Sequence, residues 1–383
     1  MRNVCVLVWL LLWPLPAMAQ SPALSSSLES GWTSNATESV GGTPDFYLRH
    51  SHDLSVTGQA GPLALRTGLQ FEREVFRHHT GENDLSITAG AEATHAFAKD
   101  MSLRLGYAMT QDWTGEMVDL GPLTITIRSP ATEHEMLAEL VVAGADRRVS
   151  VGVEALARRP GPSAFEGLDI NPVQIEPEVL QIKARIEGEW VVTPQLAGLT
   201  QLEWITTHVP ALDRAAFGRE PARIARVATG LRLGQGGLNA QLRGGLDLVW
   251  PEAAPHLLLR LPFVEADAAL ALNEHLSLTA RVQAITALFN PVDGVASRLL
   301  EGELGLRLAL AEAVTLTGGA SWSREQGLFD ETVTINQNGI RAGLAFLLAP
   351  NVEAGLVATH DNYDDNDGAY SVRSIGMTLS GKV

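Results

Sequence analysis

Apolar and polar residues alternate along most of this chain in short stretches. Residues 276–284 read LSLTARVQA, in which every second residue is apolar while Arg281 and Gln283 belong to the other set. A period of two residues places the two sets on opposite faces of a β-strand. Similar stretches recur almost to the C-terminus, so the pattern predicts an all-β protein whose sheet has one apolar face and one polar face.

The predicted strands form a series of hairpins. Connections such as 59–61, 98–100 and 350–351 are short, whereas those at 116–131 and 159–177 are longer and more polar. Short turns on one side and long loops on the other are typical of outer-membrane barrels. The prediction is therefore a transmembrane antiparallel up-and-down β-barrel of about 18 strands (16–18). The predicted strands are 25–36, 45–57, 62–76, 83–97, 102–114, 132–143, 148–158, 178–192, 195–208, 222–233, 238–250, 256–272, 276–289, 297–310, 314–326, 332–348, 352–360 and 369–382.

Two further features bear on this count and on the membrane. The segment 123–127 also alternates, and it would either extend a hairpin beyond the membrane or add strands. Trp113, Trp204, Trp250 and Trp322 fall at or near the far ends of predicted strands, within the apolar set. Tryptophans in such positions are typical of the aromatic girdle that flanks the apolar band of a barrel.

The N-terminus has the features of a cleavable secretory leader. Arg2 precedes an apolar run from Val4 to Trp13, and Ala17-Met18-Ala19 forms a small-x-small cleavage site. We therefore expect a signal peptide at 1–19 and one barrel domain at 20–383. Sec-type export would deliver the mature chain to the outer membrane of a Gram-negative bacterium. The only cysteine, Cys5, lies in this leader, so the mature chain would have no disulfide.

The chain is acidic, with 44 Asp and Glu against 28 Lys and Arg and a formal net charge of -16. A nucleic-acid-binding surface requires clustered Lys and Arg, so nucleic acid is excluded as a partner. Many of the charges lie on the polar set of the predicted strands. Ionised groups in such numbers are too costly for a dry core, but a wet lumen accommodates them.

The same alternation identifies candidate functional residues. The predicted pore-lining residues are Arg66, Arg104, Arg185, Arg243, Arg281, Arg307, Glu72, Glu92, Glu187, Glu203, Glu301 and Glu303. The loop at 159–177 contains four prolines together with Glu166 and Asp169. A stiff loop of this kind either folds into the pore and narrows it, or lies over the mouth or in solvent. Both alternatives remain open from the sequence.

Catalytic and metal-binding motifs are weak. His78-His79, His50 with His52, and His134 have no partner at a diagnostic spacing, so we predict no metal or other cofactor and no enzymatic activity. The acidic segment 361–368 fails the spacing of a calcium loop and is expected to be solvated. A hydrolase would need Ser, His and a carboxylate brought together in space, which the sequence order does not reveal.

A family resemblance rests on the opening Glu29-Ser30-Gly31-Trp32-Thr33-Ser34-Asn35-Ala36, on Asp45-Phe46-Tyr47-Leu48, and on the uninterrupted hairpins that follow. With these features the chain resembles the β-barrel porin 2 family of outer-membrane proteins. The resemblance covers the whole mature chain and implies an association with exopolysaccharide export. The end of the chain, Gly381-Lys382-Val383, departs from the aromatic residue that is common there.

These observations favour a passive outer-membrane channel, or a conduit associated with exopolysaccharide export. The alternative is a barrel with a closed lumen that serves as a structural or surface-interaction protein, and an integral hydrolase is a less favoured one. The expected partners are outer-membrane lipid and lipopolysaccharide, the barrel assembly machinery, and small hydrophilic solutes or polysaccharide. The sequence leaves the oligomeric state open.

Overall fold

The computed structural model describes residues 19–119, 124–288, 294–329, 333–366 and 368–383. The expected signal peptide, apart from Ala19, therefore lies outside the described residues. The strands are β1 (Ala19–Thr33), β2 (Asp45–Ala60), β3 (Leu63–Phe76), β4 (Asp84–Ala98), β5 (Met101–Asp119), β6 (Thr124–Ala143), β7 (Arg147–Pro160), β8 (Ala164–Glu166), β9 (Val179–Thr193), β10 (Leu196–His208), β11 (Ala222–Gln235), β12 (Leu238–Pro251), β13 (Leu259–Ala271), β14 (Leu276–Ala287), β15 (Ser297–Ala311), β16 (Val314–Gly327), β17 (Thr334–Ala349), β18 (Val352–Asp365) and β19 (Gly368–Lys382).

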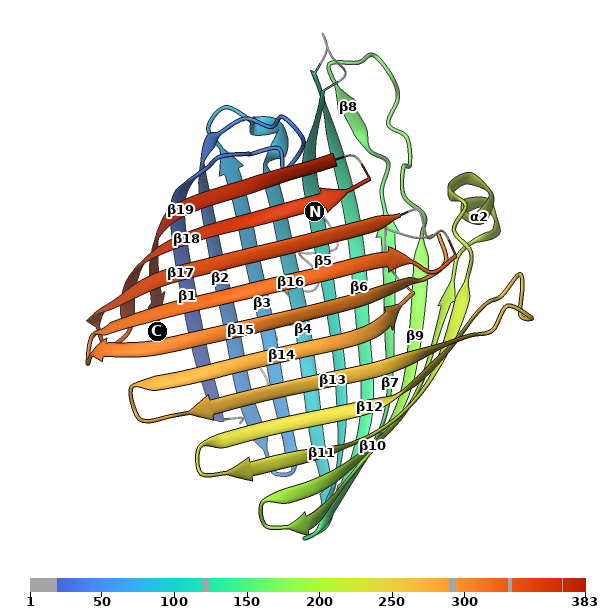
Figure 1. Ribbon diagram of the computed structural model, residues 1–383, viewed down its shortest axis with the longest axis vertical. Helices are drawn as coiled ribbons and strands as arrows, with labels where there is room; N and C mark the ends of the chain where they lie inside the picture. The colour runs from blue at the N-terminus through green and yellow to red at the C-terminus, as the bar shows by residue number, and fades with distance from the viewer. Residues whose placement is uncertain (1–18, 120–123, 289–293, 330–332, 367) are drawn as a thin grey trace.

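Antiparallel pairing between neighbouring strands closes the sheet into a barrel (Figure 1). The last strand, β19, returns to the first, and their ladder runs from Ser25 opposite Lys382 to Thr33 opposite Ser374. The short strand β8 pairs only with β6, while β7 pairs directly with β9. The wall therefore has 18 strands, which confirms the predicted closed antiparallel barrel. Closure leaves no long unpaired edge in contact with lipid.

The hairpin of β5 and β6 extends past the rest of the wall. With 19 and 20 residues, β5 and β6 are the longest of the described strands. β8 pairs with residues 126–128 of β6 and continues the line of β7 along it (Figure 1). Residues 124–127 of this alternation thus lengthen the β5–β6 hairpin and add no strand to the barrel, because their described partners are β5 and the short β8.

The two faces of the wall differ as the alternation predicts. Apolar side chains such as Leu202, Val227 and Leu246 are exposed on the outer face. Glu203, Arg226 and Asp247 have the opposite parity and lie on the inner face, where they are buried among other side chains. An apolar exterior with a polar interior suits a barrel in a bilayer. Within the described residues, no helix is long and apolar enough to cross a membrane.

One ladder of the wall stops early. β13 and β14 pair only from Val264 opposite Ala284 to Ala271 opposite Ser277. Beyond that point, residues 259–263 of β13 and 285–287 of β14 run on without pairing to each other. Pro262 lies in this part of β13, and proline has no N–H to donate to a ladder. The proline therefore accounts for part of the interruption.

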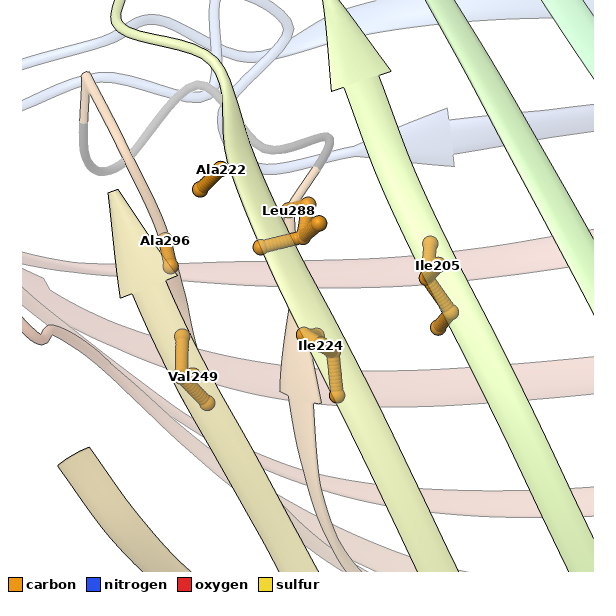
Figure 2. Close-up of a cluster of buried hydrophobic side chains, with 6 residues drawn as sticks. All are labelled: Ile205, Ala222, Ile224, Val249, Leu288 and Ala296. Atoms are coloured by element: carbon orange, nitrogen blue, oxygen red, sulfur yellow. The ribbon is translucent and has the colours of Figure 1, made fainter. Parts of the chain in front are cut away.

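Past this interruption, the described residues at the end of the β14–β15 hairpin, 286–288 and 296–298, lie inside the barrel, and we call them the hairpin tip. Thr286 and Leu288 have the parity of the exposed Val282, yet both are buried. Leu288 and Ala296 form an apolar cluster with residues of the inner faces of β10, β11 and β12 (Figure 2). The cluster consists of Ile205, Ala222, Ile224, Val249, Leu288 and Ala296. The hairpin tip thus forms a second layer behind the wall and occupies part of the lumen.

Candidate functional site

A row of charges crosses the inner wall from β9 to β12. Arg185, Glu203, Arg226 and Asp247 lie directly opposite one another on successive strands. Their signs alternate, and opposite charges at directly opposed positions of a sheet attract one another. The row arises because each strand places a charged residue of the inner set at the same level of the barrel.

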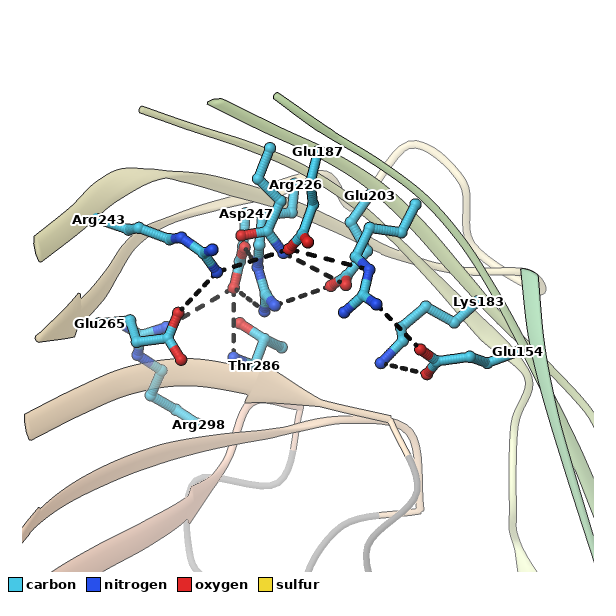
Figure 3. Close-up of polar contacts among 12 residues, drawn as sticks. Glu154, Lys183, Glu187, Glu203, Arg226, Arg243, Asp247, Glu265, Thr286 and Arg298 are labelled. Carbon is cyan, nitrogen blue, oxygen red and sulfur yellow. Dashed lines mark hydrogen bonds and ion pairs between the residues drawn. The ribbon is translucent and has the colours of Figure 1, made fainter. Parts of the chain in front are cut away.

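The centre of this row is a buried ion cluster (Figure 3). Arg226 Nε lies 2.7 Å from Asp247 Oδ1, and Arg226 Nη1 lies 2.8 Å from Glu203 Oε1. The guanidinium also stands 4.3 Å from the ring centroid of Phe263. The side chains of Arg226, Glu203 and Asp247 are 9%, 4% and 0% exposed. Charges this deeply buried are tolerated only when paired and hydrogen-bonded.

The same cluster attaches the hairpin tip to the wall. The backbone N–H of Thr286 donates to Asp247 Oδ2 over 3.2 Å, and Arg298 Nη1 lies 3.9 Å from that oxygen. Arg298 also donates to the carbonyl of Pro262, which lies in the part of β13 that does not pair with β14. Side-chain contacts therefore replace the missing ladder between β13 and β14.

A second group of ion pairs on the inner wall is more open to water. Lys183 Nζ lies 2.7 Å from Glu154, and Arg185 lies 3.4 Å from the same carboxylate. Arg243 lies 3.6 Å from Glu187 and is also paired with Glu265. The side chains in these pairs are 19% to 36% exposed, as expected for groups that face a wet lumen.

The other predicted pore-lining residues lie in two further parts of the inner wall. Arg104 pairs with Glu92 at 2.6 Å, and both residues line a cavity of about 540 Å³ together with Arg66. Arg281 and Glu303 line another cavity, of about 460 Å³. The remaining three of the set lie on β3 and β15, opposite serine or glutamine: Glu72, Glu301 and Arg307.

Several partners in these pairs were missed from the sequence, namely Glu154, Arg226 and Glu265. Arg226 shares its face with Ile224, so β11 does not show a clean polar set. Ile224 is apolar because it packs against the hairpin tip, a contact that local alternation does not reveal. Many charges of the wall are thus paired with the opposite sign, which weakens their combined field.

The loop that contains Glu166 and Asp169 lies at the end of the wall and not within the lumen. Glu166 belongs to β8, and its Oε1 lies 3.5 Å from Nε of Arg128 on the extension of β6. Asp169 is exposed. Pairing with β6 holds this segment in line with β7 (Figure 1). Of the two positions that the sequence leaves open for 159–177, the structure therefore has the one outside the lumen, and the segment packed inside the barrel is instead the hairpin tip of β14–β15.

The end of the barrel where the long loops lie carries a group of carboxylates. Burial raises the pKa of Glu38, and the nearby Glu74 and Asp361 raise it further. Burial likewise raises the pKa of Glu82 to about 7, although the N–H of Met117 donates to its carboxylate. These groups make the mouth acidic. Among the described residues, no group of three or more His, Cys, Asp or Glu has the geometry of a metal site.

No protein-family model matches the chain, and no curated protein matches it either. Solved structures match in fold. A mutant of the ferric enterobactin receptor PfeA from Pseudomonas aeruginosa has a TM-score of 0.51 and 8% identity, over 95% of this chain and 80% of that one. The copper transporter OprC has a TM-score of 0.52 and 10% identity, over 95% and 81%.

The FrpB iron transporter from Neisseria meningitidis has a TM-score of 0.52 and 9% identity, over 89% of this chain and 62% of that one. The present chain thus spans less than two thirds of FrpB. At such low identity these likenesses concern the fold alone. The chain has the barrel fold of Gram-negative outer-membrane proteins.

Proposed function

We propose that this protein is a passive channel of the Gram-negative outer membrane through which small hydrophilic solutes diffuse. The observation that carries the proposal is the band of partly exposed ion pairs around Arg185 and Arg243 on the inner wall. Ionised groups keep such exposure only beside water, because a dry lumen would impose a large desolvation cost. A water-filled lumen in a closed barrel is a route across the membrane.

The wall also indicates how solutes would pass. Polar groups of both signs line it, so a hydrated solute can exchange hydrogen bonds with water for hydrogen bonds with side chains. Pairing of Arg243 with Glu187 and Glu265 leaves little net charge in that part of the band. We therefore expect weak ion selectivity and a cutoff set mainly by size, with the hairpin tip as the narrowing element.

Purified protein in planar bilayers tests the channel directly. Discrete conductance steps are expected from the folded protein and none from a heat-unfolded sample. Absence of steps from a folded, membrane-inserted barrel would contradict the proposal. It would favour a closed structural or surface-interaction barrel, for which the apolar cluster around Leu288 and Ala296 is the specific observation.

A conduit for exopolysaccharide is a second form of the same proposal, and it rests on the resemblance to the β-barrel porin 2 family. Liposome swelling with oligosaccharides of increasing length separates the two forms. Passage of monosaccharides alone favours a general solute channel, whereas passage of long linear chains favours a polysaccharide conduit. Lipid and lipopolysaccharide would contact the apolar outer face, and the barrel assembly machinery would insert the chain.

A further inference from the structure

A hydroxyl, an imidazole and a carboxylate lie in line at the long-loop end of the barrel. Thr43 Oγ1 lies 2.6 Å from His79 Nε2, and His79 Nδ1 lies 3.0 Å from Asp45 Oδ2. Thr43 lies near the end of the connection between β1 and β2, and Asp45 is the first residue of β2. His79 belongs to the connection between β3 and β4, directly before the 3-10 helix η1 (Thr80–Glu82). Pairing of β2 with β3 brings the two connections together.

The carboxylate of Asp45 is held firmly in place. Its side chain is 0% exposed, and the backbone N–H groups of His78 and His79 donate to Oδ2 over 2.7 and 2.8 Å. The N–H of Phe46 donates to Oδ1 over 2.8 Å, and His78 Nδ1 lies 2.9 Å from the same oxygen. A carboxylate with this many donors cannot rotate freely, so it fixes the orientation of the imidazole that it contacts.

The hydrogen-bond pattern assigns the protons. An ionised carboxylate only accepts, so Nδ1 of His79 must carry the hydrogen that it donates to Asp45. In the neutral ring Nε2 is then an acceptor, and the hydroxyl of Thr43 donates to it. This is the alignment in which a histidine serves as general base toward a nucleophilic hydroxyl and a carboxylate orients the ring.

The hydroxyl is accessible and its loop is ordered by internal hydrogen bonds. Thr43 is exposed, whereas Asp45 behind it is buried. The carbonyl of Thr43 accepts from the N–H of Ala36 over 2.8 Å, and the Asn35 amide donates to the carbonyl of Ser39 over 2.8 Å. The threonine therefore presents its hydroxyl from a fixed backbone, as nucleophilic catalysis requires.

We propose that Thr43, His79 and Asp45 form a hydrolytic site for small carboxylic esters. Thr43 Oγ1 attacks the ester carbonyl carbon while His79 Nε2 takes the hydroxyl proton. The alcohol leaves with that proton as the C–O bond breaks, and the acyl group remains on Thr43. Water then attacks this acyl-threonine, gives a proton to His79, and releases the carboxylic acid as Thr43 regains its hydrogen. Asp45 stabilises the imidazolium in both steps.

This site does not depend on the lumen. Thr43 and His79 lie in connections at the mouth and Asp45 lies at the start of β2, away from the ion pairs of the wall, so the inference does not require an open channel. Hydrolysis by a barrel that does not conduct would support the site and contradict the channel. Conductance without hydrolysis would support the channel and contradict the hydrolytic site.

The test uses the full-length protein in detergent micelles with p-nitrophenyl acetate and a fluorophosphonate probe. Thr43→Ala and His79→Ala are expected to lower kcat/KM by about 100-fold or more, the usual range for removing a base or nucleophile. Thr43→Ser keeps the hydroxyl and removes the methyl group, so its rate should rise. Mass spectrometry should locate the probe on Thr43 in the parent and nowhere in Thr43→Ala.

Two matched variants separate catalysis from loop structure. Ser39→Ala removes a hydroxyl of the same loop that contacts Thr37 and not the imidazole, so its activity should equal the parent's. His78→Ala removes the other imidazole that contacts Asp45. The decrease in kcat/KM of this variant should be much smaller than that of His79→Ala. Equal losses in the two histidine variants, or a parent rate no faster than buffer, would overturn the proposal. Heat modifiability on detergent gels confirms that each variant is folded.

Discussion

Replacing Asp247 with alanine should destabilise the barrel far more than the loss of an exposed charge on the same inner wall. Its carboxylate is 0% exposed and receives two hydrogen bonds from Arg226, at 2.7 and 3.1 Å. It also accepts the N–H of Thr286 and lies near Arg298. The substitution leaves two buried guanidinium groups with one fewer anion, and it releases the hairpin tip.

The magnitude follows from burial. Removing one member of a buried ion pair costs about 3–5 kcal/mol, because the partner remains buried and uncompensated. A cost of 1.4 kcal/mol is about tenfold in the folding equilibrium, so the expected change is at least about 100-fold. Arg281 is the matched control. It lies on the same face, 3.7 Å from Asp267, but both side chains are 46% exposed. Loss of an exposed pair costs about 0–1 kcal/mol.

Urea unfolding in lipid vesicles measures both values. Tryptophan fluorescence follows the transition, and gel migration without boiling reports the closed barrel. Asp247→Ala should move the midpoint clearly to lower urea, whereas Arg281→Ala should leave it nearly unchanged. Equal shifts for the two variants would refute the argument, because they would mean that burial in the cluster does not set the cost.

Three other outcomes are expected. Val282→Arg should cost about 2–4 kcal/mol in bilayers if it lies near the midplane, since this exposed residue faces lipid; a loss no larger than that of Arg281→Ala in the same urea titration would contradict the assigned faces. Glu166→Gln with Asp169→Asn should leave the reversal potential in a salt gradient unchanged, because both residues lie beyond the wall, and a shift would place their loop in the pore. The 13C NMR chemical shift of the Glu82 carboxyl carbon should change with a midpoint near pH 7. Its pKa is raised from 4.5, so its contribution to stability is greatest below about pH 4.5 and is lost as pH rises to about 7; Glu82→Gln should abolish that part of the pH dependence.

Local pattern was sufficient to predict the strands, because each strand of a barrel meets lipid on one face and the lumen on the other. The boundaries of the β5–β6 hairpin differ most from the prediction, since β6 begins at Thr124 and the predicted strand begins at 132. The β14–β15 tip was not predictable. Thr286 and Leu288 continue the outer set of β14, and only the interruption at Pro262 and the contact with Ile224 turn them inward.

The candidate hydrolytic site was hidden for a different reason. His79 and Thr43 are 36 residues apart and meet only through the register of β2 and β3. The pair His78-His79 was visible in the sequence, but the hydroxyl that contacts His79 belongs to Thr43, which lies in another loop. The number of residues between two loops that a hairpin brings together depends on the length of its strands. No fixed spacing in the sequence therefore indicates that these residues lie together.

The tucked hairpin tip also constrains the order in which the chain can assemble. Its contacts join Leu288 and Ala296 to residues between Ile205 and Val249, whereas the hydrogen bond from the N–H of Arg373 to Ser34 spans 339 residues. Contacts between nearer parts of a chain form at a lower loop-closure cost and tend to form earlier. The tip can therefore settle against β10–β12 while the sheet is still open. Joining of β19 to β1 would then enclose a segment that is already packed, and it would not have to be threaded in through the mouth.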